Sequence, residues 1–140
     1  MELDRGAERT LTELDHARLA RLTRNLAGAT RRSDGDLLAQ TLESATLVSS
    51  PRIPADVVTM RSTVALRDLE TSRRYRLTLC YPQDAEPAAG SVSVLAPLGA
   101  SMLGLRVGAD ARWSLPHGGQ RAARLEAILF QPEASGEFTR

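Results

Sequence analysis

Leucines recur at helical intervals in the first part of the chain, which is the pattern of a helix with one buried face. The leucines that share this face are Leu11, Leu14, Leu19, Leu22 and Leu26. Thr10 and Glu13 have the spacing of a capping box, and Thr12 with Asp15 offers an alternative start. We expect this helix to end near Ala27.

A second helical pattern follows after a short polar stretch. Ser33 or Asp34 can serve as its N-cap, and Leu38, Leu42 and Ala45 fall on one face. Two short helices joined by a short polar loop predict an antiparallel hairpin. A small coiled coil fits this length, but two heptads are too few to establish one.

The second part of the chain alternates apolar and polar residues, and a period of two is typical of half-buried strands. The clearest strand contains Tyr75, Leu77, Leu79 and Tyr81. Shorter patterns predict four further strands, which contain Val64 with Leu66, Val92 with Val94, Ala111 with Trp113 and Leu115, and residues 121–130. These segments predict a small antiparallel sheet.

One short helix interrupts the strands, because Pro97–Gly104 has proline at its start and glycine at its end. Ser49–Pro54 is rich in proline and serine, so we interpret it as a linker. The expected fold class is α+β. Residues 1–50 form the N-terminal antiparallel helical hairpin, and residues 51–140 form an antiparallel sheet that packs one short helix.

Composition disfavours nucleic acid as a partner. The formal net charge is +1, whereas a protein that binds phosphate backbones by charge is usually far more basic. Aromatic residues make up 4%, which leaves little material for stacking bases. All 18 basic residues are arginine, so lysine-based chemistry is excluded. We expect a partner recognised by shape, and no direct sequence-specific contact with nucleic acid.

Nothing in the sequence indicates a membrane partner. No apolar run approaches the roughly 20 residues that cross a bilayer, and the charged N-terminus lacks an apolar signal region. We therefore expect a cytoplasmic protein. The sequence leaves its oligomeric state open.

Residues with catalytic potential are isolated along the chain. Cys80 is the only cysteine, so no intrachain disulfide forms, and its place in a strand indicates a structural thiol. His16 and His117 lie in different halves without a nearby carboxylate cluster, which disfavours a zinc site. Ser101 lacks the context of a nucleophile elbow. The sequence thus predicts no catalytic residue, no metal and no cofactor.

Five segments, in order along the chain, resemble the Rnk family. They are Ile53–Met60, Leu79–Pro82, Ser93–Ala100, Leu103–Gly108 and Phe130–Ala134. The fourth segment is also similar to the Gre transcript-cleavage factors. A helical hairpin precedes the matching region in Rnk, as it is expected to do here. Each segment alone is a weak signal, whereas five in the right order are specific.

This resemblance implies an FKBP-like fold for the C-terminal domain, without prolyl isomerase activity. In Gre factors this domain docks at the rim of the RNA polymerase secondary channel, and a long coiled coil carries two acidic residues that help to hold Mg²⁺ at the polymerase active site. Rnk has a shorter hairpin, lacks transcript cleavage and competes for the same region. Its name records an effect on nucleoside diphosphate kinase levels. The resemblance therefore implies a non-enzymatic transcription regulator that binds RNA polymerase.

The expected length of the hairpin separates these two activities. A helix of about 16 residues is roughly 24 Å long, whereas a Gre-type helix measures about 45 Å. Oxygen ligands must lie within about 2.1 Å of Mg²⁺, so this hairpin stops short of the polymerase active site. Asp34 and Asp36 lie near the expected tip, where helix capping accounts for them. Arg31 and Arg32 beside them oppose recruitment of a cation.

A proline-bearing polar loop at residues 81–87 follows a predicted strand, and exposed loops on a rigid sheet commonly carry recognition. By resemblance, the matching loop of the Gre factors lies near the polymerase contact, with the turn at Pro97 and Leu98 close by. We predict that RNA polymerase contacts Asp84, Glu86, Pro97 and Leu98. The alternative is a solvated turn without a partner.

Three alternative functions stay open. An active Gre-like cleavage factor would need a longer hairpin with a paired acidic tip. An FKBP-like peptide-binding module would need an aromatic pocket, for which the few aromatic residues offer little material, and Trp113 is expected in the core. A protein that regulates nucleotide metabolism by direct contact would bind a kinase instead of polymerase.

Overall fold

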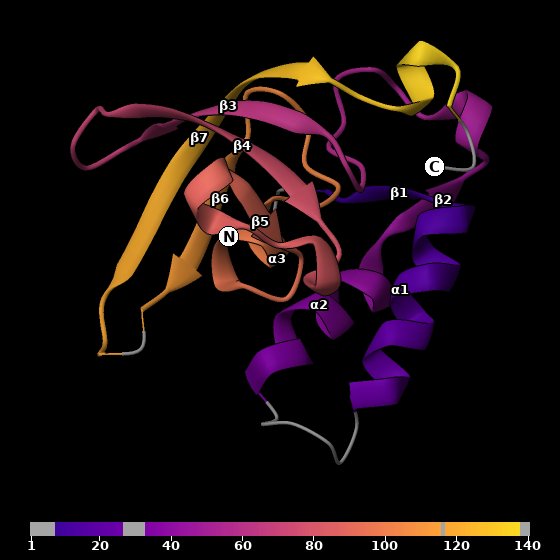
Figure 1. Cartoon of the computed structure of the whole chain (residues 1–140), viewed down its shortest axis with the longest axis horizontal. Coiled ribbons are helices and arrows are strands. Elements are labelled where there is room, and N and C mark those ends of the chain that lie inside the picture. Colours follow the sequence, from indigo (N-terminus) through magenta and orange to yellow (C-terminus); the bar gives the residue numbers. More distant parts are fainter. Residues whose placement is uncertain (1–7, 27–32, 116, 138–140) are drawn as a thin grey trace.

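The computed structural model describes residues 8–26, 33–115 and 117–137 of the chain. Figure 1 shows a helical hairpin on one side of the molecule and a curled sheet on the other. The expected α+β fold class is confirmed, and the helices and longer strands lie close to the segments that their periodicity predicts. No helix in the described part of the chain has the length and apolar character needed to span a membrane.

The hairpin consists of α1 (Glu13–Leu26) and α2 (Ser33–Ser44). The N–H of Asp15 donates to Thr12 Oγ1 at 3.0 Å, which is the hydrogen bond of an N-cap. Of the two starts that the sequence allowed, the one at Thr12 is therefore the observed one.

Two short strands flank the hairpin, and the sequence pattern does not predict them. β1 (Thr10–Thr12) pairs in parallel with β2 (Thr46–Val48). The leucine pattern assigns Leu11 to the first helix, and the adjacent apolar residues Leu47 and Val48 do not alternate with polar ones, so neither strand stands out. The N–H of Thr10 also donates to the carbonyl of Gly104 at 3.1 Å, so the base of the hairpin is bonded to the second half of the chain.

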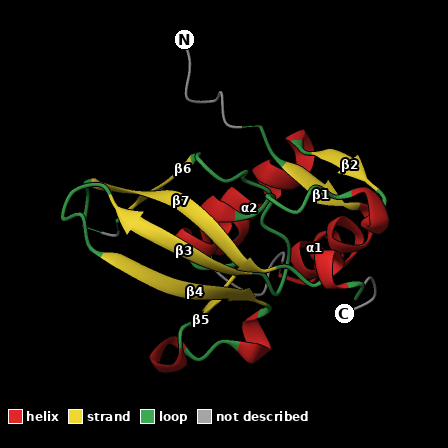
Figure 2. Ribbon diagram, turned by 90° about the horizontal axis from the view of Figure 1, so that it is seen from above, coloured by secondary structure: helices red, strands yellow, loops and turns green. Residues whose placement is uncertain are grey.

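The main sheet contains five strands in the order β5-β4-β3-β7-β6 (Figure 2). The strands are β3 (Thr63–Asp68), β4 (Arg74–Cys80), β5 (Ser91–Ser93), β6 (Asp110–Ser114) and β7 (Gln120–Phe130). β3 pairs antiparallel with β4 and β7, and β7 pairs antiparallel with β6. β5 runs parallel to β4, so the sheet is mixed where the sequence led us to expect antiparallel pairing throughout.

The chain between β4 and β5 explains the parallel pair. Parallel neighbours need a crossover, because a tight hairpin turn reverses the chain. Residues 81–90 form this crossover with two 3₁₀ helices, η3 (Pro82–Asp84) and η4 (Pro87–Ala89). An alternating pattern identifies the two faces of a strand but not the direction of its neighbour.

One hydrophobic core joins the hairpin to the sheet. Its largest fully buried side chains come from both halves of the chain and include Leu11, Leu19, Leu38, Leu66, Leu79, Met102, Leu103 and Leu125. The expected short helix is α3 (Pro97–Met102), which contacts both β6 and α2. The expected linker, Ser49–Pro54, contains one 3₁₀ turn, η2 (Ser50–Arg52), and the core is continuous across it.

Polar contacts and one glycine fasten the hairpin to the sheet. Arg9 Nη1 donates to the Leu103 carbonyl at 3.1 Å, and the N–H of Met60 donates to Asp15 Oδ2 at 3.1 Å. Gly104 has a φ of +82°, and an added Cβ would lie 3.2 Å from the side chain of Leu11. Glycine therefore permits both the left-handed backbone and the close approach of β1.

Candidate functional site

The four residues predicted as partner contacts, Asp84, Glu86, Pro97 and Leu98, lie on segments that surround β5. β5 contacts η3, η4 and the helix α3, which carry or adjoin these residues (Figure 1). We call the surface that these four residues occupy the β5 surface. Its members come from separate parts of the chain and are brought together by the crossover.

The first turn of the crossover positions Asp84. Pro82 opens η3, where the fixed φ of proline suits the first helical position. The N–H of Asp84 donates to the Tyr81 carbonyl at 2.9 Å, and the N–H of Ala85 donates to the Pro82 carbonyl at 3.2 Å. Asp84 therefore projects from a hydrogen-bonded turn that follows directly on β4.

The second turn of the crossover holds Glu86 beside β5. The N–H of Glu86 donates to the Ser91 carbonyl, and the N–H of Ser91 donates to the Glu86 carbonyl, each at 3.1 Å. The side chains of Glu86 and Asp84 are both exposed. The crossover thus presents two acidic side chains next to the same short strand.

Gly99 brings the first turn of α3 onto β5. A Cβ at this position would lie 2.1 Å from the carbonyl oxygen of Ser93, a distance that only glycine avoids. Pro97 at the start of this helix is exposed, whereas Leu98 is half-buried and packs against the core. Ser101 Oγ donates to the Leu98 carbonyl at 2.7 Å, so its hydroxyl has a structural role within the helix.

Arg61, which sequence reasoning did not identify, supports Asp84. Arg61 Nη1 lies 3.3 Å from Asp84 Oδ2, and its guanidinium lies over the Tyr81 ring at 5.3 Å from the centroid. Arg61 has a φ of 69°, which is uncommon for a residue other than glycine. No sequence pattern marks such a residue. Because the ion pair is partly exposed, it orients Asp84 more than it stabilises the fold.

The only cysteine lies beneath this surface with its side chain buried. Cys80 Sγ donates to the Val92 carbonyl at 3.5 Å. Burial raises the pKa of the Cys80 thiol, and the charge of Asp84 raises it further, whereas Arg61 opposes the shift. A thiol with a raised pKa is protonated near neutral pH and is a poor nucleophile. This environment supports the structural role expected for Cys80.

The two histidines lie in separate parts of the molecule. His16 Nε2 lies 3.0 Å from the Leu42 carbonyl, and this hydrogen bond joins α1 to α2. His117 is exposed in the turn before β7. Within residues 8–26, 33–115 and 117–137, no group of three or more His, Cys, Asp or Glu side chains could hold a metal ion.

The hairpin is shorter than its leucine pattern suggests. α1 has 14 residues, which corresponds to about 21 Å. Asp34 and Asp36 fall in the first turn of α2, but their side chains lie outside the described part of the structure, as do Arg31 and Arg32.

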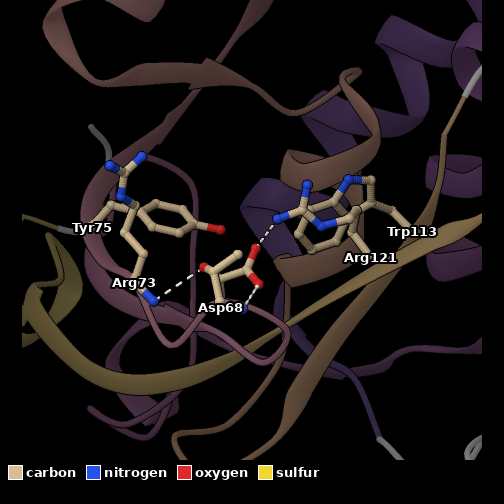
Figure 3. A pocket seen from close by; sticks show the side chains of 6 residues that line it. Asp68, Arg73, Tyr75, Trp113 and Arg121 are labelled. Carbon is tan, nitrogen blue, oxygen red and sulfur yellow. Dashed lines mark hydrogen bonds and ion pairs between the residues drawn. The ribbon is translucent and has the colours of Figure 1, made fainter.

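A pocket that sequence reasoning missed lies toward the other end of β4 (Figure 3). It has a volume of about 660 Å³ and is lined by Asp68, Thr71, Arg73, Tyr75, Trp113 and Arg121. Trp113 was expected in the core, and it both packs against the core and lines this pocket. Tyr75 and Trp113 share the core-facing phase of their strands. The sequence therefore shows that both rings lie on the core-facing side of their strands. It does not show that they are neighbours, because that depends on the order of the strands in the sheet.

Comparison with known proteins assigns the chain to a family. Residues 53–129 match the family model described as "Transcription elongation factor, GreA/GreB, C-term". A regulator of nucleoside diphosphate kinase from Escherichia coli K12 is 39% identical over 103 residues, which is 74% of this chain and 76% of that protein. A transcription elongation factor GreA from Chloroherpeton thalassium is 32% identical over 81 residues, or 58% of this chain and 51% of that protein.

A solved structure agrees with the sequence matches. A prokaryotic transcription elongation factor GreA/GreB from Nitrosomonas europaea superposes with a TM-score of 0.71 at 34% identity, and the match covers 88% of this chain and 100% of that one. The resemblance found in the five sequence segments is therefore confirmed. The chain belongs to the GreA/GreB family of transcription factors and is a homologue of the regulators of nucleoside diphosphate kinase.

Proposed function

We propose that this protein is a non-enzymatic transcription regulator that binds RNA polymerase at the rim of the secondary channel through the β5 surface. The family assignment supports RNA polymerase as the partner. The length of the hairpin is the observation that carries the rest of the proposal. If RNA polymerase is the partner, the protein acts in the cytoplasm.

The hairpin length argues against transcript cleavage. At about 1.5 Å per residue, the 14 residues of α1 extend about 21 Å, whereas a Gre-type helix of about 30 residues extends about 45 Å. A carboxylate must come within about 2.1 Å of Mg²⁺ to coordinate it. A shortfall of about 24 Å cannot be recovered by side-chain movement. The protein would therefore occupy the channel rim without assisting cleavage.

A protein that occupies the channel rim without assisting transcript cleavage would act by competing with the Gre factors for that site. A Gre factor and this protein would exclude each other from the same rim, so their relative concentrations and affinities decide which is bound. The exposed acidic pair Asp84 and Glu86 would meet basic groups on polymerase, and such pairs raise association rates and specificity. The effect recorded in the name of the Escherichia coli relative would then follow from altered transcription and need no kinase activity.

The binding proposal is tested with purified core RNA polymerase by interferometry, with a GreA protein as competitor. We expect specific binding that GreA displaces and that Asp84→Asn weakens by about two- to tenfold. Asp56→Asn is the matched control, because Asp56 also forms an exposed ion pair, with Arg106 at 3.6 Å, away from the β5 surface. Absence of binding at tens of micromolar, or an equal loss in both variants, would contradict the proposal.

The lack of cleavage is tested separately on backtracked elongation complexes. We expect no shortened transcripts with this protein, and reduced cleavage when it is added before GreA, because the two compete for the rim. GreA alone serves as the positive control. Shortened transcripts produced by this protein alone would establish the alternative, an active cleavage factor.

A further inference from the structure

The pocket at the far end of β4 has no part in the proposed function. Its side chains come from Asp68 at the end of β3, Tyr75 in β4, Trp113 in β6 and Arg121 in β7 (Figure 3). The β5 surface follows the Cys80 end of β4, whereas Tyr75 is near the start of that strand. The two features therefore lie at opposite ends of one strand and can be tested independently.

The floor of the pocket is a carboxylate whose acceptor positions are occupied. Asp68 is 3% exposed, and its Oδ1 accepts the N–H groups of Glu70 at 2.8 Å and Thr71 at 3.0 Å. Its Oδ2 accepts a hydrogen bond from Arg121 Nη2. The bonds from Thr71, Glu70 and Arg121 lower the pKa of Asp68 despite its burial. Asp68 is thus a fixed anion that holds the Arg121 guanidinium in place.

The remaining hydrogen-bonding capacity of the pocket consists of donors. Arg121 Nε is buried without a hydrogen-bond partner, although it forms an ion pair with Glu70 Oε1 at 3.7 Å. Among the described residues, no hydrogen bond engages the Tyr75 hydroxyl or the Trp113 indole N–H. Burial and the charge of Asp68 both raise the pKa of Tyr75, so its hydroxyl keeps its proton. A ligand that fits must therefore bring acceptors.

Charge and shape narrow the ligand further. Arg73 is exposed at the rim, whereas Arg121 lies inside and pairs with both Asp68 and Glu70, so among the described lining residues Arg73 supplies the guanidinium that is available to a ligand. Tyr75 and Trp113 are half-buried and present aromatic faces, which favour contact with an apolar or aromatic side chain. The pocket combines the exposed guanidinium of Arg73 at its rim with an apolar wall.

The surroundings of the pocket disfavour a nucleic-acid strand. A strand needs a continuous basic track for its phosphates. On the outer face of the sheet, Arg67 and Arg74 pair with Glu126, and Arg124 pairs with Asp110. Arg67 and Arg74 lie on the opposite face of the sheet from Asp68 and Tyr75, because neighbouring residues of a strand point to opposite faces. The outer arginines therefore do not extend the charge of the pocket.

We propose that this pocket binds an acidic peptide segment, with an apolar or aromatic side chain between Tyr75 and Trp113 and a neighbouring carboxylate on Arg73. The indole N–H and the phenol hydroxyl donate to backbone carbonyls of the peptide. Guanidinium groups suit this role because they bind carboxylates through paired N–H donors. The site would give the protein a second contact with a partner, separate from the β5 surface.

The chain carries its own probe for this test, because Trp113 is the only tryptophan. Its fluorescence is followed while the protein is titrated with a blocked peptide in which one glutamate neighbours one phenylalanine. We expect a saturable change with a dissociation constant between about 10 μM and 1 mM. The same peptide with glutamine in place of glutamate, and the same peptide with alanine in place of phenylalanine, should each bind several-fold more weakly.

Arg73→Gln and Arg76→Gln form the matched pair of variants. Each removes one exposed arginine, Arg73 at the rim of the pocket and Arg76 on the outer face of β4, where it pairs across the strands with Ala65. Arg73→Gln should weaken binding of the glutamate peptide by about two- to fivefold and leave binding of the glutamine peptide unchanged. Arg76→Gln should bind as the parent protein does. Arg121 is not substituted, because that change would leave the Asp68 carboxylate buried and unpaired.

Three results would overturn the proposal. The first is that the Trp113 fluorescence shows no saturable change up to about 5 mM peptide. The second is that the two arginine variants lose affinity for the glutamate peptide equally. The third is that the protein binds a short oligoribonucleotide more tightly than the glutamate peptide. None of these results bears on polymerase binding through Asp84, so the two proposals can fail separately.

Discussion

Asp15 shows how one buried charge joins the hairpin to the sheet. Its side chain is 3% exposed, and its Oδ2 accepts the N–H of Met60 at 3.1 Å. The pKa of Asp15 is raised from 3.8 to about 6, chiefly by burial and also by the charge of Glu133, while the Met60 bond and Arg18 oppose the shift. The carboxylate is therefore less favourable in the folded protein than in the unfolded chain.

Replacement of Asp15 should change the pH dependence of stability. Because its folded pKa lies above the unfolded value, the stabilisation that it contributes is complete below about pH 3.8 and is lost as the pH rises through about 6. Asp15→Asn cannot ionise and keeps an acceptor for Met60. We expect it to raise the free energy of unfolding at pH 7.5 by about 1–3 kcal/mol and to make little difference near pH 4.

Urea denaturation at several pH values measures this effect. The exposed acid Asp56 supplies the control, and Asp56→Asn should follow the pH profile of the parent protein. If Asp15→Asn keeps the parent slope between pH 4 and 7, the raised pKa is not the cause of that slope.

At the scale of single elements, sequence patterns located most of the fold. Period and capping residues placed both helices of the hairpin, the four longer strands and α3. β1 and β2 were missed because Leu11 fits the leucine pattern of the first helix and Leu47 and Val48 are adjacent apolar residues without alternation. The parallel direction of β5 was missed because an alternating pattern identifies the two faces of a strand but not the direction of the strand beside it. Arg61 was missed because its left-handed backbone depends on the turn before β3 and not on its residue type.

Gly99 is the residue on which the contact between α3 and β5 depends. A methyl group there would lie 2.1 Å from the Ser93 carbonyl oxygen, so Gly99→Ala must displace the helix. We expect a loss of about 1–3 kcal/mol in the free energy of unfolding, as for other overpacked contacts. Polymerase binding should weaken as well, because Pro97 and Leu98 move with the helix.

The same assays test both parts of this prediction. Ala88→Ser changes a small exposed residue of η4 on the same side of the sheet and should leave stability within about 0.5 kcal/mol of the parent value. A Gly99→Ala protein with unchanged stability would show that α3 adjusts without cost, which the close contact argues against.

At the scale of the whole molecule, sites depend on strand order, which a single sequence does not reveal. Tyr75, Trp113 and Arg121 lie on three strands, and only their pairing around β3 makes a pocket. Overall charge was equally uninformative, since a net charge of +1 includes a pocket with two arginines and an acidic pair beside β5. The partner prediction therefore came from resemblance and not from composition.

The shared core predicts that the hairpin and the sheet unfold together. Leu38 in α2 is 1% exposed and belongs to the same core as Leu79 of β4 and Leu125 of β7. Leu38→Ala should cost about 2–5 kcal/mol, because it removes buried apolar contacts and leaves a cavity. If the core acts as one unit, this loss affects the sheet as much as the helices.

Two optical signals distinguish cooperative from separate unfolding. Far-ultraviolet circular dichroism follows the helices, and the fluorescence of Trp113 follows the sheet. In the parent protein and in Leu38→Ala, we expect the two denaturation curves to coincide, with a common midpoint that the substitution lowers. Noncoincident curves, with only the helical signal shifted, would mean that the hairpin folds as a separate unit. Coincident curves would instead mean that the hairpin and the sheet unfold as one cooperative unit.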